Sequence, residues 1–427
     1  MPRSRSTEND PPRAGVYETA GSDMREIDDL KRQAIAEVDR RAAQLWEAAQ
    51  TIGRNPELGH QEHKSVKTLT DLLADGEIEA EVGIADLATA WRARIGSRRR
   101  PTVAILAEFD ALPGIGHGCG HNLIGPSAVG AGLALATVAQ YLPGSVVILG
   151  TPAEESTVDN SGGKVHLIRA GYFDDVDASI MFHPSQYTNM SLEGSLAARG
   201  VDFIYHGKAA HASLYPWEGI NALDGVLHTY SGINALRQHV RPEIRIHGVI
   251  TSGGGVPNVV PQLASCRFRV RAPDDEQLES VFKRVVQCAE GGALMAGARL
   301  EIREYMPPYE NVVPNLTLAR AFRRNLEGIG LKVLDGRPEE GLGSTDFGNV
   351  TRRVPAIEAG IAVADPGVPH HSAAFAEAAL SEKAHGAVLA AAKGLAMTAI
   401  DILTDPSLLS EAKAEFDAGP GKLRTPD

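Results

Sequence analysis

The segment 102–125, TVAILAEFDALPGIGHGCGHNLIG, constrains the fold more than any other part of the 427-residue chain. An apolar run over 102–106 predicts a buried strand, a glycine-rich loop follows, and small and apolar residues over 123–141 predict a helix. The loop carries Glu108, Asp110, Cys119 and His121. Because open α/β sheets bind ligands at the carboxyl ends of their strands, we expect the functional site in this loop.

Three later predicted strands also end in side chains that can do chemistry. SVVILGTPAEES ends in Glu154 and Glu155, ASIMFHPS ends in His183, and AIEAGIAVADPGVPHHS leads to His370 and His371. If these strands are parallel in one sheet, a thiol, imidazoles and carboxylates meet at one edge. Those are the ligand types that a divalent transition metal selects.

This convergence predicts a metal site and a general base beside it. Adjacent side chains in extended backbone point to opposite sides, so Glu155 is assigned to metal and Glu154 to proton transfer. Asp110 is expected to orient His121, although a turn-forming role is an alternative. An isolated Cys-x-His motif would favour a structural cysteine in a tight turn. Here Glu155, His183 and His371 are expected at the ends of neighbouring strands, which favours a metal-binding role. The predicted ligands are Cys119, His121, Glu155, His183 and His371.

The order of predicted elements divides the chain into domains. Residues 195–307 read strand, helix, strand, strand, helix, strand, which is the ferredoxin-like order. We therefore expect an α/β catalytic domain with a mixed sheet, built from 24–194 and 308–427, and an inserted α+β domain over 195–307. The polar segment 1–23 is expected to be a disordered tail.

Composition excludes several classes of protein. A net charge of −12 argues against a nucleic-acid partner, which would require a basic surface. No N-terminal apolar segment approaches the ~20 residues of a membrane helix, so we expect no membrane anchor. Three cysteines argue against a disulfide framework and fit a cytoplasmic protein.

Taken together, the motifs GHGCGHN, GTPAEE, GKAAHAS, GGGVPNVVP, GSTDFGNV and HHSAAF resemble a known family. It comprises the co-catalytic metallopeptidases that include aminoacylases, carnosine-type dipeptidases, auxin-conjugate amidohydrolases and aminobenzoyl-glutamate hydrolases. The resemblance runs from about Met24 to Leu403. It implies the five ligands above, with His371 preferred to His370, and Glu154 as the base.

The resemblance adds two residues of the inserted domain. It implies that His211 reaches across a dimer to stabilise the oxyanion, and that Asn258 binds the substrate's terminal carboxylate. Many relatives begin the metal site with His-x-Asp, whereas this chain has Glu108 at the first position. The amidohydrolase branch also lacks that histidine, so the departure indicates this branch.

The sequence therefore predicts a metal-dependent hydrolase with two divalent ions, zinc or manganese, with cobalt also possible. It would cleave the amide bond of an N-acyl amino acid, an aminobenzoyl-glutamate-like conjugate or a small dipeptide by Glu154-assisted attack of metal-bound water. We expect a homodimer formed through the inserted domain. The alternatives are an amidase with Cys119 as nucleophile, its base being His121 or His183, and a non-catalytic binding protein of the same fold.

Overall fold

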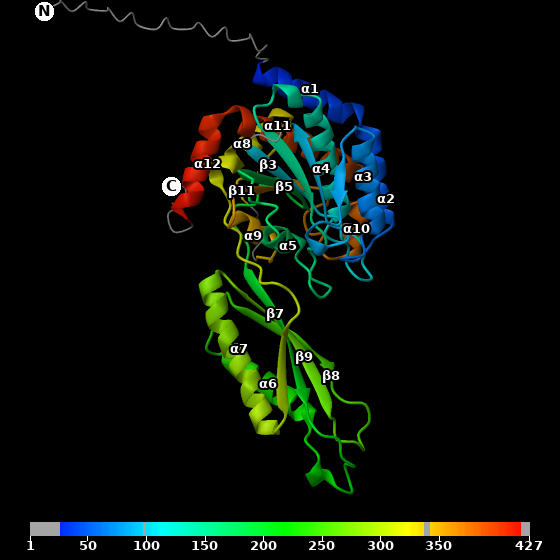
Figure 1. Ribbon diagram of the computed structural model, residues 1–427, viewed down its shortest axis with the longest axis vertical. Helices are drawn as coiled ribbons and strands as arrows, with labels where there is room; N and C mark the ends of the chain where they lie inside the picture. Colours follow the sequence, from blue (N-terminus) through cyan, green and yellow to red (C-terminus); the bar gives the residue numbers. More distant parts are fainter. Residues whose placement is uncertain (1–25, 97–99, 337–341, 420–427) are drawn as a thin grey trace, which may run out of the picture.

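The computed structural model describes residues 26–96, 100–336 and 342–419. The predicted disordered tail, 1–23, lies outside these residues. Figure 1 shows two lobes, an upper one that contains the larger sheet and a lower one that is joined to it by two chain connections.

The upper lobe is built on a seven-stranded sheet in the order β1-β2-β4-β3-β5-β11-β6. Its four central strands are parallel, and the outer strands pair antiparallel. The parallel strands are the four that end in the predicted site residues: β3 (Thr102–Ala107), β4 (Ser145–Gly150), β5 (Ala178–Ser185) and β11 (Ala356–Ala362). The outer strands are β1 (Ala80–Val82), β2 (Trp91–Gly96) and β6 (Asn189–Met190). The expected mixed-sheet α/β class is therefore confirmed.

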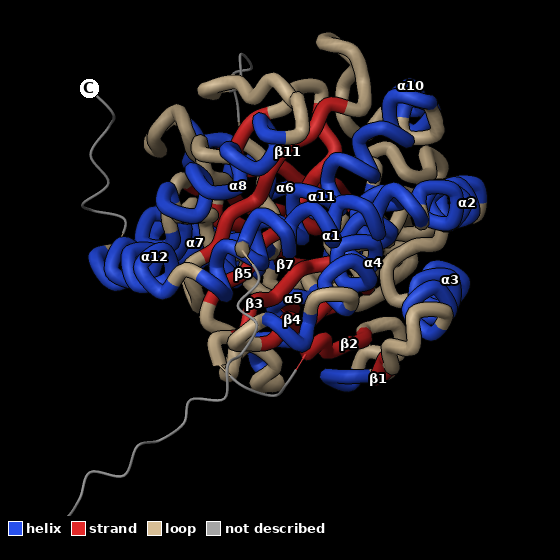
Figure 2. The backbone as a smooth tube through the Cα atoms, turned by 90° about the horizontal axis from the view of Figure 1, so that it is seen from above, coloured by secondary structure: helices blue, strands red, loops and turns tan. Residues whose placement is uncertain are grey.

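Helices cover this sheet and bury its apolar strands. Every residue of β3 and β4 is buried, as expected for parallel strands with both faces covered. Figure 2 shows the sheet running between groups of helices. The helices of this lobe are α1 (Ile27–Arg40), α2 (Ala42–Arg54), α3 (His63–Ala74), α4 (His121–Ala136), α5 (Gly163–Arg169), α8 (Leu316–Gly328), α9 (Phe347–Thr351), α10 (Ala373–Ala378), α11 (Glu382–Thr404) and α12 (Pro406–Ala418).

One helical segment differs from expectation. Continuous periodicity after Met24 predicts one helix, but the chain breaks at Arg41 into α1 and α2. Arg41 has φ −95° and ψ 6°, outside the helical region, and its mostly buried side chain still pairs with Glu37 of α1 at 2.6 Å. Helix α11 has the length and hydropathy of a membrane span, yet 72% of its most apolar window is buried within the fold.

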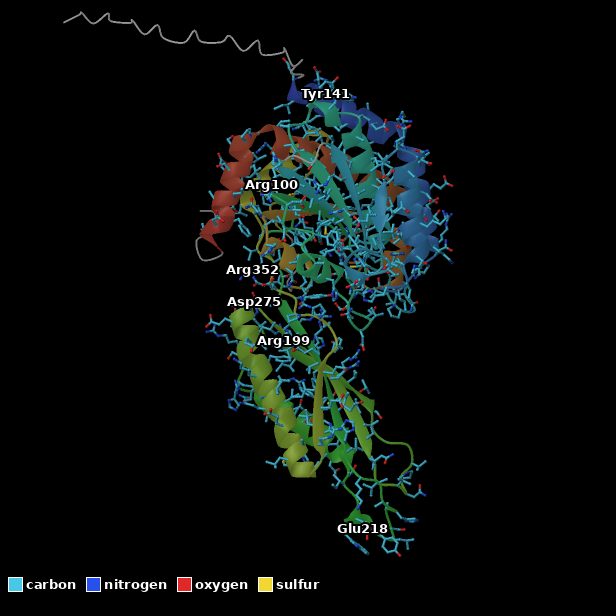
Figure 3. All side chains as sticks on the ribbon, in the orientation of Figure 1. Arg100, Tyr141, Arg199, Glu218, Asp275 and Arg352 are labelled. Carbon is cyan, nitrogen blue, oxygen red and sulfur yellow. The ribbon has the colours of Figure 1, made fainter. Side chains whose placement is uncertain are left out.

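The lower lobe is the inserted domain, with its own core. Its antiparallel sheet has the order β10-β7-β9-β8, and α6 and α7 pack on it (Figure 1). This is the expected ferredoxin-like order: β7 (Ala197–His206), α6 (Ala222–Arg237), β8 (Arg245–Ser252), β9 (Leu263–Ala272), α7 (Asp275–Ala296) and β10 (Arg299–Glu304). At the junction of the lobes, Arg352 and Asp275 lie 3.5 Å apart (Figure 3).

Candidate metal centre

The glycine-rich loop between β3 and α4 brings two distant parts of the chain together. Gly120 precedes α4 with φ +79°, a conformation that favours glycine, and His121 is the first helical residue. The backbone N–H of His371 donates to the carbonyl of Gly118 at 2.8 Å. A Cβ on Gly118 would lie 3.3 Å from the Cα of His371, so glycine allows this close approach. The loop after β11 is thereby fixed against the loop after β3.

The five predicted ligands form two groups that share the thiol of Cys119. In each group the potential ligand atoms lie within 4.8 Å of one another. The Sγ of Cys119 is 3.7 Å from His183 Nε2, and His371 Nε2 is 3.3 Å from a Glu155 carboxylate oxygen. The groups are Cys119, His121 and His183, and Cys119, Glu155 and His371. The structure thus brings all five together, and their roles as ligands stay predictions.

The imidazoles of His121 and His183, which form one ligand group with Cys119, are oriented by hydrogen bonds on their Nδ1 atoms. His121 Nδ1 lies 2.9 Å from Asp110 Oδ1, and His183 Nδ1 lies 2.8 Å from the carbonyl of Pro184. The other oxygen of Asp110 accepts from the backbone N–H of Glu155 at 3.0 Å. Burial opposes ionisation of Asp110, but the hydrogen bond and charge of His121, together with the backbone N–H of Glu155 and the charge of Lys164, lower the pKa of Asp110 overall. Asp110 therefore positions two predicted ligands at once.

The donor atoms fit a bound cation. His121 Nε2 is buried and makes no hydrogen bond with a described residue, although a Glu108 carboxylate oxygen lies 3.3 Å away, so this donor atom is available to a cation. Burial, together with neighbouring carboxylates, raises the pKa of Glu155 to about 8. Burial and Glu155 also raise the pKa of the Cys119 thiol. A divalent ion would reverse these shifts, because it stabilises thiolate and carboxylate.

His370 also lies close to this centre. Its Nδ1 is 3.9 Å from the Cys119 Sγ, while its ring stacks on Phe375 with centroids 4.2 Å apart. His371 instead belongs to one of the two ligand groups. This placement agrees with the preference for His371, which stays a prediction.

Comparison with known proteins gives the family. Residues 104–393 match peptidase family M20/M25/M40. The chain belongs to this family. It is 37% identical to the Xaa-Arg dipeptidase of Mus musculus, over 93% of this chain and 95% of that protein. It is 29% identical to a component of the p-aminobenzoyl-glutamate hydrolase of Escherichia coli, over 88% of this chain and 90% of that protein.

The fold agrees with this assignment. A Bacillus subtilis protein described as a dinuclear metal-binding peptidase from the M20 family superimposes with a TM-score of 0.61. The alignment covers 86% of this chain and 99% of that chain, at 21% identity. This M20 peptidase is therefore a hydrolase of peptide or amide bonds, as the sequence resemblance implied.

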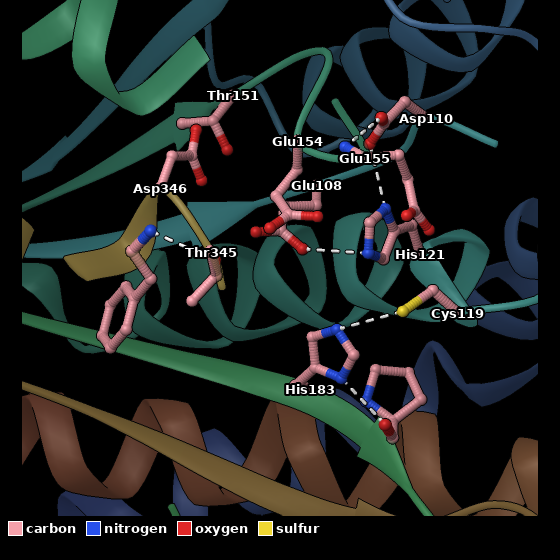
Figure 4. Close-up of polar contacts among 12 residues, drawn as sticks. Glu108, Asp110, Cys119, His121, Thr151, Glu154, Glu155, His183, Thr345 and Asp346 are labelled. Carbon is pink, nitrogen blue, oxygen red and sulfur yellow. Dashed lines mark hydrogen bonds and ion pairs between the residues drawn. The ribbon is translucent and has the colours of Figure 1, made fainter. Parts of the chain in front are cut away.

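A buried lysine next to the centre of this M20 peptidase was missed by the sequence analysis. The Nζ of Lys164, on α5, pairs with Glu108 and Asp346, and all three side chains are at most 1% exposed. Carboxylate oxygens of Glu108, Asp346 and Glu154 lie within 4.8 Å of one another (Figure 4). Burial raises the pKa of Asp346 to about 7 although Lys164 opposes the shift. Lys164 thus supplies fixed positive charge beside the predicted base.

A cavity of about 340 Å³ opens beside the ligand groups and includes both lobes in its lining. Arg269 and Arg271 of β9 line it, and Arg271 Nη1 donates to Ser344 Oγ at 3.3 Å. Burial, then the charge of Arg269, lowers the pKa of Arg271 to about 10. Neither arginine forms an ion pair with a described residue. The arginine alternation in CRFRVRA was the available signal, but such a pattern ordinarily marks a solvated face.

His211 and Asn258 lie outside this cavity. They occupy neighbouring loops of the inserted domain, where the N–H of Ala212 donates to the Asn258 carbonyl at 3.0 Å. The segment 207–221, whose Glu218 is labelled in Figure 3, reaches the end of the domain remote from the larger sheet. Within one chain, the structure does not bring either residue to the predicted ligands. Their predicted roles require a second chain.

A buried carboxylate supports the loop that carries the adjacent glutamates. Glu62 accepts hydrogen bonds from the Ala153 backbone N–H at 2.9 Å and from Thr89 Oγ1 at 2.7 Å. Ala153 has φ +57°, a strained value for a residue with a side chain. Burial, then the charge of Asp110, raises the pKa of Glu62 from 4.5 to about 7.

This shift predicts a pH-dependent stability difference between the native protein and Glu62→Gln. Between pH 4.5 and 7 the folded state holds a proton at Glu62 that the unfolded state has lost, so stability falls as pH rises. The glutamine variant lacks this loss, and its amide can still bond to Ala153 and Thr89. From pH 5 to pH 8, urea unfolding should show the variant gaining about 2–3 kcal/mol relative to the native protein. Parallel pH profiles for the two proteins would refute the assignment.

Proposed function

We propose that this M20 peptidase hydrolyses the amide bond of an N-acyl amino acid, an aminobenzoyl-glutamate-like conjugate or a small dipeptide, with two divalent ions bound. The observation that carries the proposal is the pair of ligand groups sharing Cys119, with Glu154 lining the same cavity. The names of the mouse and Escherichia coli relatives support the last two substrate classes.

The predicted ligands form two pairs of residues, and Cys119 is common to both groups. His121 and His183 would hold one ion, and Glu155 and His371 the other. Bound ions would supply a Lewis acid that polarises the amide carbonyl and lowers the pKa of a water molecule. Thiolate and imidazole favour zinc, carboxylate tolerates manganese, and cobalt is also compatible.

Glu154 is the residue that moves the proton. Its carboxylate lies with those of Glu108 and Asp346, near the positive charge of Lys164. It would accept a proton from the attacking water and deliver it to the leaving nitrogen. Arg269 and Arg271, which have no carboxylate partner among the described residues, would bind the carboxylate of the substrate.

A cysteine nucleophile is the less favoured mechanism. Burial and the charge of Glu155 raise the pKa of Cys119, whereas a nucleophilic cysteine needs a lowered one. Cys119 belongs to both ligand groups, which favours a metal-binding role for its thiol instead.

Metal removal separates the two mechanisms. Purified protein would be screened against N-acyl amino acids, aminobenzoyl-glutamate and β-alanyl dipeptides, before and after dialysis against a chelator. We expect hydrolysis to disappear on chelation, and to return when zinc or manganese is added at about two ions per chain. Chelator-resistant hydrolysis that a thiol alkylator abolishes would instead support the nucleophile. Hydrolysis of no substrate in the screen would reject the proposed substrate classes.

We also propose a homodimer formed through the inserted domain. Strand β8 is an edge of its sheet, and Val249 and Ile250 on it are 59% and 46% exposed. Trp217, in the segment that follows His211, is 75% exposed. A second chain that covered these apolar side chains could bring His211 and Asn258 to a catalytic centre. Cytoplasmic localisation stays a prediction from the sequence.

A further inference from the structure

The catalytic cavity contains a carboxylate that the proposed mechanism does not use. Glu358, on β11, is half-buried and lines the cavity together with Glu154 and His183. Ser191 Oγ donates to its carboxylate at 3.0 Å. No lysine, arginine or histidine among the described residues forms an ion pair with it. A half-buried carboxylate beside a substrate cavity is stabilised by a cationic ligand.

Strand register places Glu358 close to the predicted metal ligands. Gly360 is paired with His183 across the parallel strands β11 and β5, and Glu358 lies two residues earlier on β11. Two residues of strand span roughly 6–7 Å, and alternate residues share a face. Gly360 is the next residue of β11 on the same face as Glu358, toward the carboxyl end of the strand. It has no side chain that could separate Glu358 from His183. A Cβ there would lie 2.7 Å from Asn189 Oδ1.

Opposite charges are supplied to the cavity by different elements. Arg269 and Arg271 come from β9 of the inserted domain, and Glu358 comes from β11 of the larger sheet. A substrate with both a carboxylate and a cationic nitrogen can pair with both sets. An acidic conjugate such as aminobenzoyl-glutamate offers no partner to Glu358 and leaves its charge uncompensated.

We propose that Glu358 binds a cationic nitrogen of the substrate and makes the enzyme selective for positively charged dipeptides over acidic conjugates. The inference rests on the proposed amide hydrolysis. The nitrogen belongs either to a basic side chain, as a guanidinium or ammonium, or to a free N-terminal amino group. Both present the same charged donor to the carboxylate, and substrates that carry only one of them distinguish the two.

Glu358→Gln in the metal-loaded full chain tests this inference with four substrates. β-Alanyl-arginine carries both cations, N-acetyl-arginine only the side-chain cation, β-alanyl-leucine only the amino cation, and N-acetyl-leucine neither. A charge-assisted hydrogen bond is worth a factor of roughly 10–100, so kcat/KM should fall by that factor where the cation meets Glu358. Hydrolysis of N-acetyl-leucine should change less than about threefold. A fall in kcat/KM on N-acetyl-arginine alone would show that Glu358 binds the basic side chain, and a fall on β-alanyl-leucine alone would show that it binds the amino group.

Two further variants keep the test decisive. Glu411→Gln removes an exposed carboxylate on α12 and should change none of the four rates. Glu358→Lys should deepen the loss on β-alanyl-arginine and raise hydrolysis of aminobenzoyl-glutamate, which no folding defect would do. Unchanged rates in Glu358→Gln, or equal losses on all four substrates, would overturn the inference while the hydrolase function stands. A native enzyme inactive on every substrate would reject the proposed function itself.

Discussion

Glu154→Gln is expected to retain two bound ions and to lose a factor of roughly 10²–10⁴ in kcat. Glutamine has the same shape as glutamate but cannot accept the proton of the attacking water. The side chain does not belong to either ligand group that shares Cys119, so metal binding should survive (Figure 4). Metal content by mass spectrometry and kcat on the best substrate of the screen measure both quantities.

The adjacent glutamate provides the matched control. Glu155 belongs to a ligand group, so Glu155→Gln should lose metal as well as activity. Both variants remove one carboxylate charge from the same loop. If Glu154→Gln kept a kcat within about threefold of the native value, Glu154 would not be the base. Equal metal loss in the two variants would remove the distinction between base and ligand.

The same variant tests the role of His211 across a dimer. His211→Ala should leave the ions bound, because His211 lies outside the cavity of its own chain. Turnover should fall, because the predicted role of His211 is to stabilise the oxyanion in the partner's centre. In a mixed dimer with Glu154→Gln, one centre combines an intact Glu154 with an intact His211 from the other chain. After random exchange of equal amounts of the two variants, about a quarter of all centres would be intact, so activity should recover to about a quarter of the native value. No recovery after verified exchange of chains would indicate that each centre is complete within one chain.

That the predicted ligands lie together could be foreseen from strand direction, whereas the choice of His371 over His370 came from the family resemblance, and their roles as ligands stay predictions. Parallel strands end at the same sheet edge, so residues as distant as Cys119 and His371 must converge once β3 and β11 are parallel neighbours of β5. The ferredoxin-like order was equally readable from alternating strand and helix patterns. By contrast, the break at Arg41 has no proline or glycine to mark it.

Other parts of the site depend on packing between distant elements. The arginines of β9 form one face of a strand, but their sequence does not reveal that the larger domain covers that face. Glu358 stands alone in the apolar run AIEAGIA, and an acidic residue in a buried strand was a signal that could have been followed. Lys164 lies in a short helix, where a lysine is ordinarily exposed. Only tertiary structure shows that two carboxylates surround it.

Lys164→Met is expected to destabilise the larger domain by about 3–5 kcal/mol, the range found when one partner of a buried ion pair is removed. Burial disfavours the charged form of Lys164, but the carboxylates of Asp346, Glu108 and Glu154 together outweigh burial and raise the pKa of Lys164. Without the lysine, carboxylates of Glu108, Asp346 and Glu154 would share a buried site with no neutralising cation at that position. Urea denaturation of the metal-free protein measures the loss without contribution from bound ions.

Two comparisons identify charge as the cause. Lys67→Met breaks the pair with Asp71, whose side chains are 74% and 63% exposed, and should cost less than about 1 kcal/mol. Adding Asp346→Asn to Lys164→Met removes one of the unpaired charges and should recover part of the lost stability. If the second substitution instead deepened the loss, packing volume around α5 rather than charge would be the role of Lys164. Recovery would show that a fixed cation holds the acidic cluster beside Glu154 in its folded arrangement.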